Sequence, residues 1–140
     1  MTVPALLLAG SIAAKKPLPA PAGRWSITST FSMGGLPFAA PARTFERCVT
    51  ERDREDPRAL LSEIAAPGDD CRVDAWSADG KTVRWTAACA GRYRGPAEGT
   101  LKFSGDAAAG EFTIRVEDAR GAPHPVRYRI EVARREDCAP

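Results

Sequence analysis

The 140-residue sequence contains a single histidine and none of the short motifs that mark common enzyme sites. His124 lies between Pro123 and Pro125, which predicts a turn, and nothing in the sequence pairs it with a nucleophile. A Gly-x-Ser-x-Gly step, a phosphate-binding loop and a dinucleotide-binding fingerprint are also absent from the sequence. We therefore expect no enzyme, and a hydrolase-like activity is only a remote alternative.

The sequence also lacks a calcium-binding loop, although acidic residues gather in two places. Asp69 and Asp70 are adjacent, and the acidic residues of segment 51–56 alternate with arginines. Neither group has the spacing of an EF-hand, and the alternation is typical of a solvated, self-neutralising helix start. We expect no metal site and no cofactor.

The cysteines include no Cys-x-x-Cys pair, which excludes the common zinc-binding patterns and a thioredoxin-like redox site. The four of them lie far apart in the sequence, at Cys48, Cys71, Cys89 and Cys138. Four cysteines behind a short apolar leader are typical of an exported protein in an oxidising compartment. We therefore expect two disulfides.

No apolar run reaches the roughly 20 residues that cross a bilayer as a helix. The run from Ala5 to Ala14 instead has the length of a signal-peptide core and ends in small residues that suit a signal peptidase. Residues 1–14 are thus predicted to be a signal peptide, and the mature protein to be periplasmic or secreted without a stable membrane anchor. Because no Lys or Arg precedes the run, we expect the true start to lie upstream of Met1. A buried N-terminal strand or helix is the alternative for this segment.

The remainder of the chain is long enough for one domain. Residues 15–22 are rich in proline and predict an extended tether, and residues 23–140 form the predicted single disulfide-bonded β-rich domain. The formal net charge of +2 is far from the strongly basic balance of a nucleic-acid-binding domain. We expect no nucleic-acid partner.

Apolar residues recur mostly at every second position, which is typical of strands. The pattern predicts a mainly β fold, a single curved antiparallel sheet or a half-barrel or sandwich of about six strands with one short helix. Leu60, Leu61 and Ile64 recur at helical spacing and predict that helix over residues 57–64, with Thr50 as a nearby N-cap candidate. The predicted strands include residues 23–33, 43–49, 72–77, 81–88, 100–103, 111–116 and 126–132.

The Asp79-Gly80 step predicts a hairpin that brings two cysteines together. If Gly80 is the centre of an odd-numbered loop, Ala75 faces Trp85 and Cys71 faces Cys89. This register favours the bridge Cys71–Cys89, and the second bridge is then Cys48–Cys138. The alternative pairing is Cys48–Cys71 with Cys89–Cys138. Its loop-closure entropy is almost the same as that of the favoured pairing, so the alternative stays open.

Several segments of the sequence resemble those of one family. They are Gly23-Arg24-Trp25, Arg47-Cys48-Val49-Thr50, Asp69-Asp70-Cys71, Trp85 to Cys89, Tyr93 to Gly105, and Asp137-Cys138. Together they resemble the exported bacterial proteins called domain of unknown function 3617, over nearly all of the mature chain. The resemblance implies a signal peptide and a β-rich body, and it supplies no activity.

A binding role fits this chain better than catalysis. A strongly twisted antiparallel sheet tends to curl, and its apolar concave face can hold a small apolar ligand. The alternative role of the same side chains is to form the core. The candidate lining consists of Trp25, Ile27, Phe31, Phe103, Phe112, Ile114, Tyr128 and Ile130.

The alternative function is that of an adaptor or inhibitor that binds another envelope protein. Leu36, Pro37 and Phe38 form the apolar tip of the loop 34–41, which is either an exposed contact site or a lid folded over the sheet. The arginines of segment 127–135 offer a basic sheet face for an anionic partner. Acidic residues among them dilute that charge, and an ordinary solvated face is the alternative.

Overall fold

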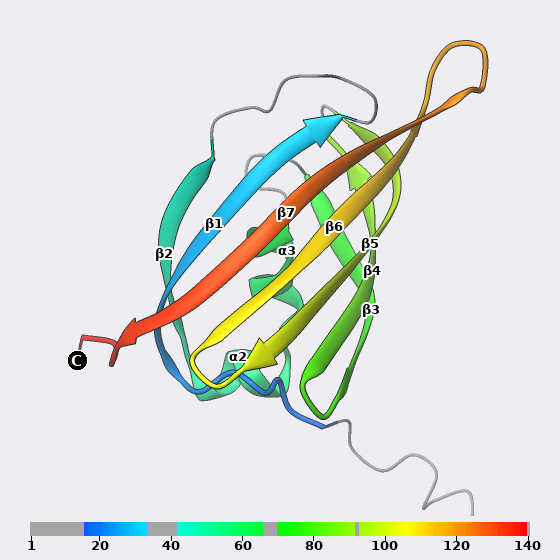
Figure 1. The fold of residues 1–140 in the computed structure, drawn as a ribbon. Helices are drawn as coiled ribbons and strands as arrows, with labels where there is room; N and C mark the ends of the chain where they lie inside the picture. The colour runs from blue at the N-terminus through cyan, green and yellow to red at the C-terminus, as the bar shows by residue number, and fades with distance from the viewer. Residues whose placement is uncertain (1–15, 34–41, 66–69, 92, 140) are drawn as a thin grey trace, which may run out of the picture.

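The computed structural model describes residues 16–33, 42–65, 70–91 and 93–139 (Figure 1). The mainly β fold is confirmed, with seven strands where about six were expected and two short helices where one was expected. The strands are β1 (Gly23–Met33), β2 (Arg43–Val49), β3 (Cys71–Asp79), β4 (Thr82–Ala90), β5 (Arg94–Ser104), β6 (Ala107–Glu117) and β7 (Pro123–Glu136). The helices are α2 (Glu51–Glu55) and α3 (Arg58–Ala65).

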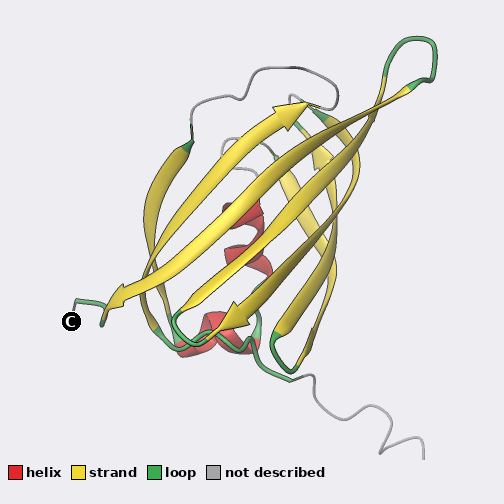
Figure 2. Cartoon of the chain, in the orientation of Figure 1, coloured by secondary structure: helices red, strands yellow, loops and turns green. Residues whose placement is uncertain are grey.

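All neighbouring strands are antiparallel, and their order in the single sheet is β2-β1-β7-β6-β5-β4-β3. The sheet curls around α3, and α2 lies at one end of the curved sheet (Figures 1 and 2). The two edge strands are β2 and β3. One face of the sheet is therefore concave and apolar, and the other faces solvent.

The last strand shows why the sequence folds this way. Val126, Tyr128 and Ile130 are buried, while the residues between them are exposed. Because successive side chains of a strand point to opposite faces, this alternation places one apolar row on the concave side. The strand β1 pairs with β7 over most of its length.

The loop between β3 and β4 differs from the expected one. It has two residues, Gly80 and Lys81, and is closed by the pair Asp79 and Thr82. Gly80 has a φ of 60°, the left-handed conformation that a two-residue hairpin loop with glycine first requires. The prediction of an odd-numbered loop was wrong.

A β-bulge in β3 compensates for the shorter loop. The register shifts between Val73 and Ala75, so Trp76 rather than Ala75 lies opposite Trp85. The extra residue reverses the alternation, and Trp76 is buried while Ala75 is exposed. The predicted pairing of Ala75 with Trp85 was therefore wrong.

Both predicted disulfides are confirmed. Cys71 and Cys89 are directly opposite one another in β3 and β4, with Cα atoms 4.0 Å apart. Cys48 in β2 is bonded to Cys138 beyond β7, with Cα atoms 5.7 Å apart. These two strands flank β1, so the second bridge spans it. Two disulfides in one small domain point to an oxidising compartment.

The helices begin at the predicted cap. The Thr50 hydroxyl accepts a hydrogen bond from the Asp53 backbone N–H at 3.2 Å, and the Asp53 carboxylate accepts one from the Thr50 backbone N–H at 2.9 Å. This capping box starts α2, and α3 follows after a short turn. The Leu60, Leu61 and Ile64 side chains of α3 are buried in the core. Neither helix has the length and apolar character of a membrane span, in the part of the chain that the structure describes.

The segment predicted as a tether packs against the domain where it is described. Leu18 and Ala20 are buried in the core, and the Leu18 backbone N–H donates to the Arg54 carbonyl at 2.8 Å. An apolar side chain between prolines docks because the core offers it an apolar contact. The predicted signal peptide, residues 1–14, lies outside the described residues.

Candidate functional site

One end of the concave face is a packed core rather than a ligand cavity. The Trp25 indole is 2% exposed and donates from Nε1 to the Pro21 carbonyl at 2.9 Å. The space left among the apolar side chains around it is about 20 Å³. Ligand sites in proteins usually exceed about 300 Å³, and this space is far smaller. The side chains around it are Leu18, Ala20, Trp25, Ile27, Val49, Leu60, Leu61, Ile64, Leu101, Phe103 and Val132.

Aromatic residues form a continuous row across the middle of the concave face. The strand register places one residue from each of six neighbouring strands in this row. The row runs through Phe31, Tyr128, Phe112, Gly99, Trp85 and Trp76. Its rings are close to their neighbours: Phe31 and Tyr128 have centroids 5.6 Å apart, and Phe112 and Tyr128 have centroids 6.4 Å apart.

Gly99 is the one position in this row without a side chain, and an indole occupies the space. A Cβ atom on Gly99 would collide with the Trp85 ring. Trp85 and Phe112, which flank Gly99 in the register, stack with centroids 6.2 Å apart and an interplanar angle of 13°. The Trp85 Nε1 atom is buried and has no hydrogen-bond partner among the residues that the structure describes.

The structure brings together three of the predicted binding residues and separates a fourth. Phe31, Phe112 and Tyr128 share the aromatic row, while Trp25 belongs to the packed end. Phe31 is half-buried, and Tyr93, ahead of β5, stacks on it with centroids 5.6 Å apart. The predicted contact residues Leu36, Pro37 and Phe38, with the whole loop 34–41, lie outside the described residues.

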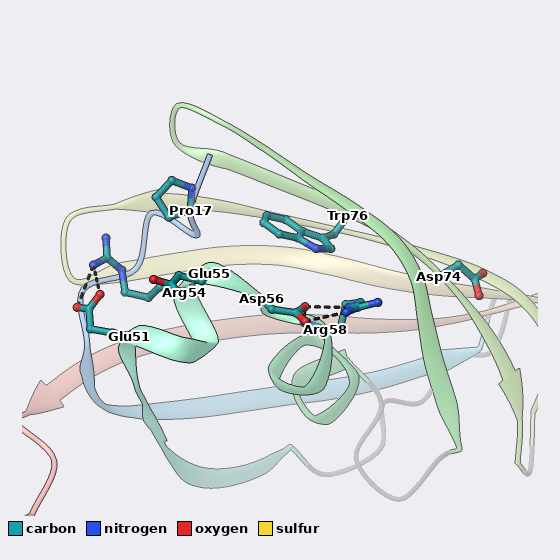
Figure 3. Close-up of a pocket in the computed structure, with 8 residues that line it drawn as sticks. All are labelled: Pro17, Glu51, Arg54, Glu55, Asp56, Arg58, Asp74 and Trp76. Carbon is teal, nitrogen blue, oxygen red and sulfur yellow. Dashed lines mark hydrogen bonds and ion pairs between the residues drawn. The ribbon is translucent and has the colours of Figure 1, made fainter. Parts of the chain in front are cut away.

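A large groove opens between the two helices and the edge strand β3 (Figure 3). Its volume is about 840 Å³. Three separate parts of the chain meet there: the segment before β1, the corner between α2 and α3, and the bulged part of β3. The lining residues are Pro17, Glu51, Arg54, Glu55, Asp56, Arg58, Asp74 and Trp76. No local pattern in the sequence links residues so far apart, so this groove was not predicted.

Both arginines of the groove are neutralised by neighbours. Arg54 Nη1 lies 2.9 Å from Glu51 Oε2, and Arg58 Nη2 lies 2.7 Å from Asp56 Oδ2. The hydrogen bond with Asp56 raises the pKa of Arg58. Glu55 and Asp74 form no ion pair among the described residues, and both are exposed. The groove therefore carries an excess of negative charge.

The apolar part of the groove is an indole wall. Trp76 is 8% exposed and lies between Pro17 on one side and Asp74 on the other (Figure 3). The bulge in β3 is the reason, because without the extra residue this side chain would point to the opposite face of the sheet. A ring of this kind offers contact to aliphatic chains and to cations.

Arg47 of β2 holds the helical side of the groove in place. Its guanidinium donates to Asp53 of α2 from Nη1 at 3.0 Å and from Nη2 at 3.3 Å, and to Glu63 of α3 from Nε at 2.9 Å. Burial opposes ionisation of Asp53, but hydrogen bonds from Arg47 and Thr50 outweigh it and lower the pKa of that carboxyl. One side chain thus fixes both helices to the sheet.

The outer face of the sheet carries the predicted arginines, with one exception. Arg127, Arg129 and Arg135 are exposed on β7, but Arg134 instead donates from Nε to the Ala22 carbonyl at 3.0 Å. Arg129 lies 3.7 Å from Glu131, so part of the positive charge is compensated. A shallow hollow of about 560 Å³ beside them has a floor of mostly small residues.

The only histidine of the sequence has a partner in its own hairpin. His124 lies near the start of β7, opposite Val116, rather than in the predicted turn, and its Nε2 lies 2.9 Å from Oδ2 of Asp118 in the adjoining exposed loop. The hydrogen bond with His124 lowers the pKa of Asp118, and the backbone N–H groups of Ala122 and Arg120 add to the effect. Within the described ranges, no three acidic, cysteine or histidine side chains are grouped so that they could hold a metal ion.

Comparison with known proteins finds one family. Residues 17–138 match the sequence model of a family described as "Protein of unknown function (DUF3617)". No curated protein and no solved structure matches the chain. The matched range includes the segment before β1, all seven strands, both helices and all four cysteines.

Proposed function

Since the chain belongs to the DUF3617 family, which is described only as of unknown function, we propose from its structure that it is a non-catalytic binding protein. Its binding site is the groove between α2, α3 and β3, and its partner is another molecule of the cell envelope. The observation that carries the proposal is the contrast between a concave interior with about 20 Å³ left at its packed end and an open groove of about 840 Å³.

The chemistry of the groove favours a polar partner over a small apolar ligand. Six of its eight lining residues are charged, and the two others, Pro17 and Trp76, give it a limited apolar wall. Apolar ligands are usually buried in pockets lined mainly by hydrophobic side chains. The proposal therefore replaces the concave face by the groove as the site of binding.

The walls of the groove are held by independent contacts, as a binding site requires. Arg47 ties both helices to β2, and the bond between Leu18 and Arg54 fixes the segment before β1. The disulfide between Cys71 and Cys89 closes the start of the hairpin that forms the third wall. A preformed site loses less conformational entropy on binding.

The proposed compartment is the periplasm, reached after removal of residues 1–14. The two disulfides support an oxidising compartment, and the apolar leader of the sequence supports export. The absence of catalysis is part of the proposal. It is supported by the pair His124 and Asp118, which is exposed and does not line the groove.

Native mass spectrometry of the oxidised protein, purified from a periplasmic extract, tests the proposal. We expect a bound species that is lost when the groove is reversed in charge by Glu55→Lys together with Asp74→Lys. The matched control is Glu117→Lys, an exposed carboxylate of β6 that does not line the groove.

A species retained by the groove variant would contradict the proposed site. Loss of that species on Arg129→Ser would instead favour the outer face of the sheet. A protein that carries no partner from extracts of cells producing it at native levels would contradict the binding role itself.

A further inference from the structure

We infer that the groove takes a basic, extended polypeptide segment that pairs with the free edge of β3. This inference deepens the proposed function, on which it rests, by naming the chemical class of the partner. Three features carry it: the position of β3 in the sheet, the direction of its backbone groups, and the charge of the groove.

The first feature is that β3 ends the sheet. Only β4 pairs with it among the described strands, so its other edge has no strand neighbour. Unpaired edges are templates for the addition of an extended peptide, whose main chain supplies the hydrogen bonds. The opposite edge strand β2 carries Arg47, which binds the helices, so the two edges are not equivalent.

The second feature is the direction of the backbone groups near the hairpin loop. A two-residue hairpin loop is closed by a hydrogen-bonded pair, here Asp79 and Thr82, and the two kinds of pair alternate along the strands. Ala78 and Val83 are therefore a non-hydrogen-bonded pair. It follows that the N–H and C=O of Ala78 point away from β4, toward the edge.

The bulge limits the length of strand that a peptide can use. The irregular step lies between Val73 and Ala75, and from Trp76 to Asp79 the pairing with β4 is regular. Four regular residues offer only a short ladder. Side-chain contacts in the groove must therefore supply much of the affinity and all of the selectivity.

The third feature is the charge that those contacts would meet. Glu51 and Asp56 are occupied by Arg54 and Arg58, whereas Glu55 and Asp74 have no basic partner in the described part of the chain. An extended peptide with basic side chains places positive charge on this side of β3 and lays its aliphatic stems on the Trp76 ring. An acidic peptide would meet unfavourable charge.

A polypeptide fits these features better than a small linear cation. A polyamine complements the two carboxylates, but it has no main-chain N–H and C=O groups to pair with the edge near Ala78. The alternative can be separated from the inference because only the peptide depends on the backbone of β3.

The test measures binding of synthetic probes to the oxidised, full mature chain by isothermal titration calorimetry. The main probe is a peptide of alternating Lys and Thr, about ten residues long so that it extends beyond the edge. The comparison probes are the same peptide with Glu in place of Lys, the Lys peptide with alternate amides N-methylated, and spermidine. We expect binding of the first peptide only, weakened by salt because exposed charges are screened.

Variants of the protein then locate the site. Glu55→Gln and Asp74→Asn should each weaken binding of the Lys peptide by about threefold to fivefold, as expected for exposed ion pairs. The matched control Glu117→Gln should leave it unchanged. Ala78→Pro removes the N–H that points to the free edge and no ladder hydrogen bond, so it should weaken binding more than either charge variant does.

The N-methylated peptide keeps the test decisive if Ala78→Pro does not fold, because it removes the same pairing from the other side. Equal binding of the methylated and unmethylated peptides would overturn the inference. A different result is that spermidine binds in a way that depends on Glu55 and Asp74 while the Lys peptide does not bind. That result would overturn the inference that the partner is a peptide, but the groove would still be a binding site. If no probe binds, the inference falls, and the bound species in native mass spectrometry decides separately whether the proposed function stands.

Discussion

Arg47 of β2 and Asp53 of α2 are joined by two hydrogen bonds, from Nη1 to Oδ2 at 3.0 Å and from Nη2 to Oδ1 at 3.3 Å. The same guanidinium reaches Glu63 of α3, and the same carboxylate closes the capping box with Thr50. Both members of the pair are largely shielded from solvent. The position of the helices on the sheet therefore depends on one arginine more than on any of the exposed ion pairs around it.

Replacing Arg47 by alanine should lower the free energy of unfolding by about 1–3 kcal/mol, because a partly buried, bidentate pair exceeds the value of a surface pair. Denaturant unfolding of the oxidised protein measures the effect. Arg58→Ala is the control: its pair with Asp56 is exposed and screened by solvent, so its loss should cost less than the loss of Arg47. Equal effects of the two variants would show that Arg47 does not hold the helices in this way.

The segment Arg47-Cys48-Val49-Thr50, one of those that carry the family resemblance, has a structural role at each position. Arg47 binds both helices, Cys48 forms a disulfide, Val49 is buried in the core, and Thr50 caps α2. Each of these residue types is needed for the local fold. The segment therefore gives no reason to look for chemistry at this place.

The ionisation of Asp53 should make stability depend on acid. Burial opposes its charge, but hydrogen bonds from Arg47 and Thr50 hold its pKa below the ordinary value of 3.8. A carboxyl with a lower pKa in the folded state adds stability above the unfolded pKa of about 3.9, and that stability is lost as the pH falls through the folded pKa. Urea unfolding between pH 7 and roughly pH 2.5 should show this loss begin near pH 4.

The variant Asp53→Asn separates this group from the other carboxyls. It should be less stable than the natural protein at pH 7. The difference should shrink below about pH 4, where Asp53 of the unfolded chain takes up a proton before Asp53 of the folded protein does. Glu117→Gln is the matched control at an exposed position. It should change the free energy of unfolding neither at pH 7 nor below about pH 4. A difference that stays constant down to the lowest pH would mean that the carboxylate charge of Asp53 is not what stabilises α2.

The sequence predicted the architecture because strong alternation leaves little choice of face. Val126, Tyr128 and Ile130 cannot move by one residue without exposing all three, so their strand was predictable. The bridge between Cys71 and Cys89 was also predictable, because one pairing register satisfied both the cysteines and the apolar face. The predicted bridge was correct although the predicted loop length was wrong. The loop is one residue shorter than expected, and the bulge in β3 adds one residue, so Cys71 still lies opposite Cys89.

The groove could not be predicted, for a physical reason. Its parts come from Pro17, from residues 51–58 and from Asp74 and Trp76, and only the tertiary fold brings them together. The burial of Trp76 depends on the bulge, which strict alternation does not reveal. The one available signal was that regular alternation would have exposed a tryptophan.

Gly99 should tolerate no side chain while Trp85 is present. A Cβ atom would collide with the indole, whose position is also fixed by stacking on Phe112. We expect Gly99→Ala to destabilise the protein by about 1–3 kcal/mol through overpacking. Denaturant unfolding in a double-mutant cycle with Trp85→Leu gives the control, because a smaller side chain leaves room for the methyl group. If Gly99→Ala lowers the free energy of unfolding equally with Trp85 and with Leu at position 85, the loss comes from the strand backbone and not from contact with the indole.

Trp25 and Trp85 offer a matched measurement of what a buried indole N–H contributes. Each side chain is 2% exposed, but Trp25 Nε1 donates to the Pro21 carbonyl at 2.9 Å, whereas Trp85 Nε1 has no partner in the described part of the chain. Replacement by phenylalanine removes a similar volume at both sites, so the packing losses should be similar. Trp25→Phe also breaks a hydrogen bond, while Trp85→Phe removes a donor that was already unsatisfied. Trp25→Phe should therefore cost about 1–2 kcal/mol more than Trp85→Phe in denaturant unfolding. If Trp85→Phe is the more costly change, its N–H has an acceptor in solution, and a bound water or ligand in the aromatic row becomes the explanation to test.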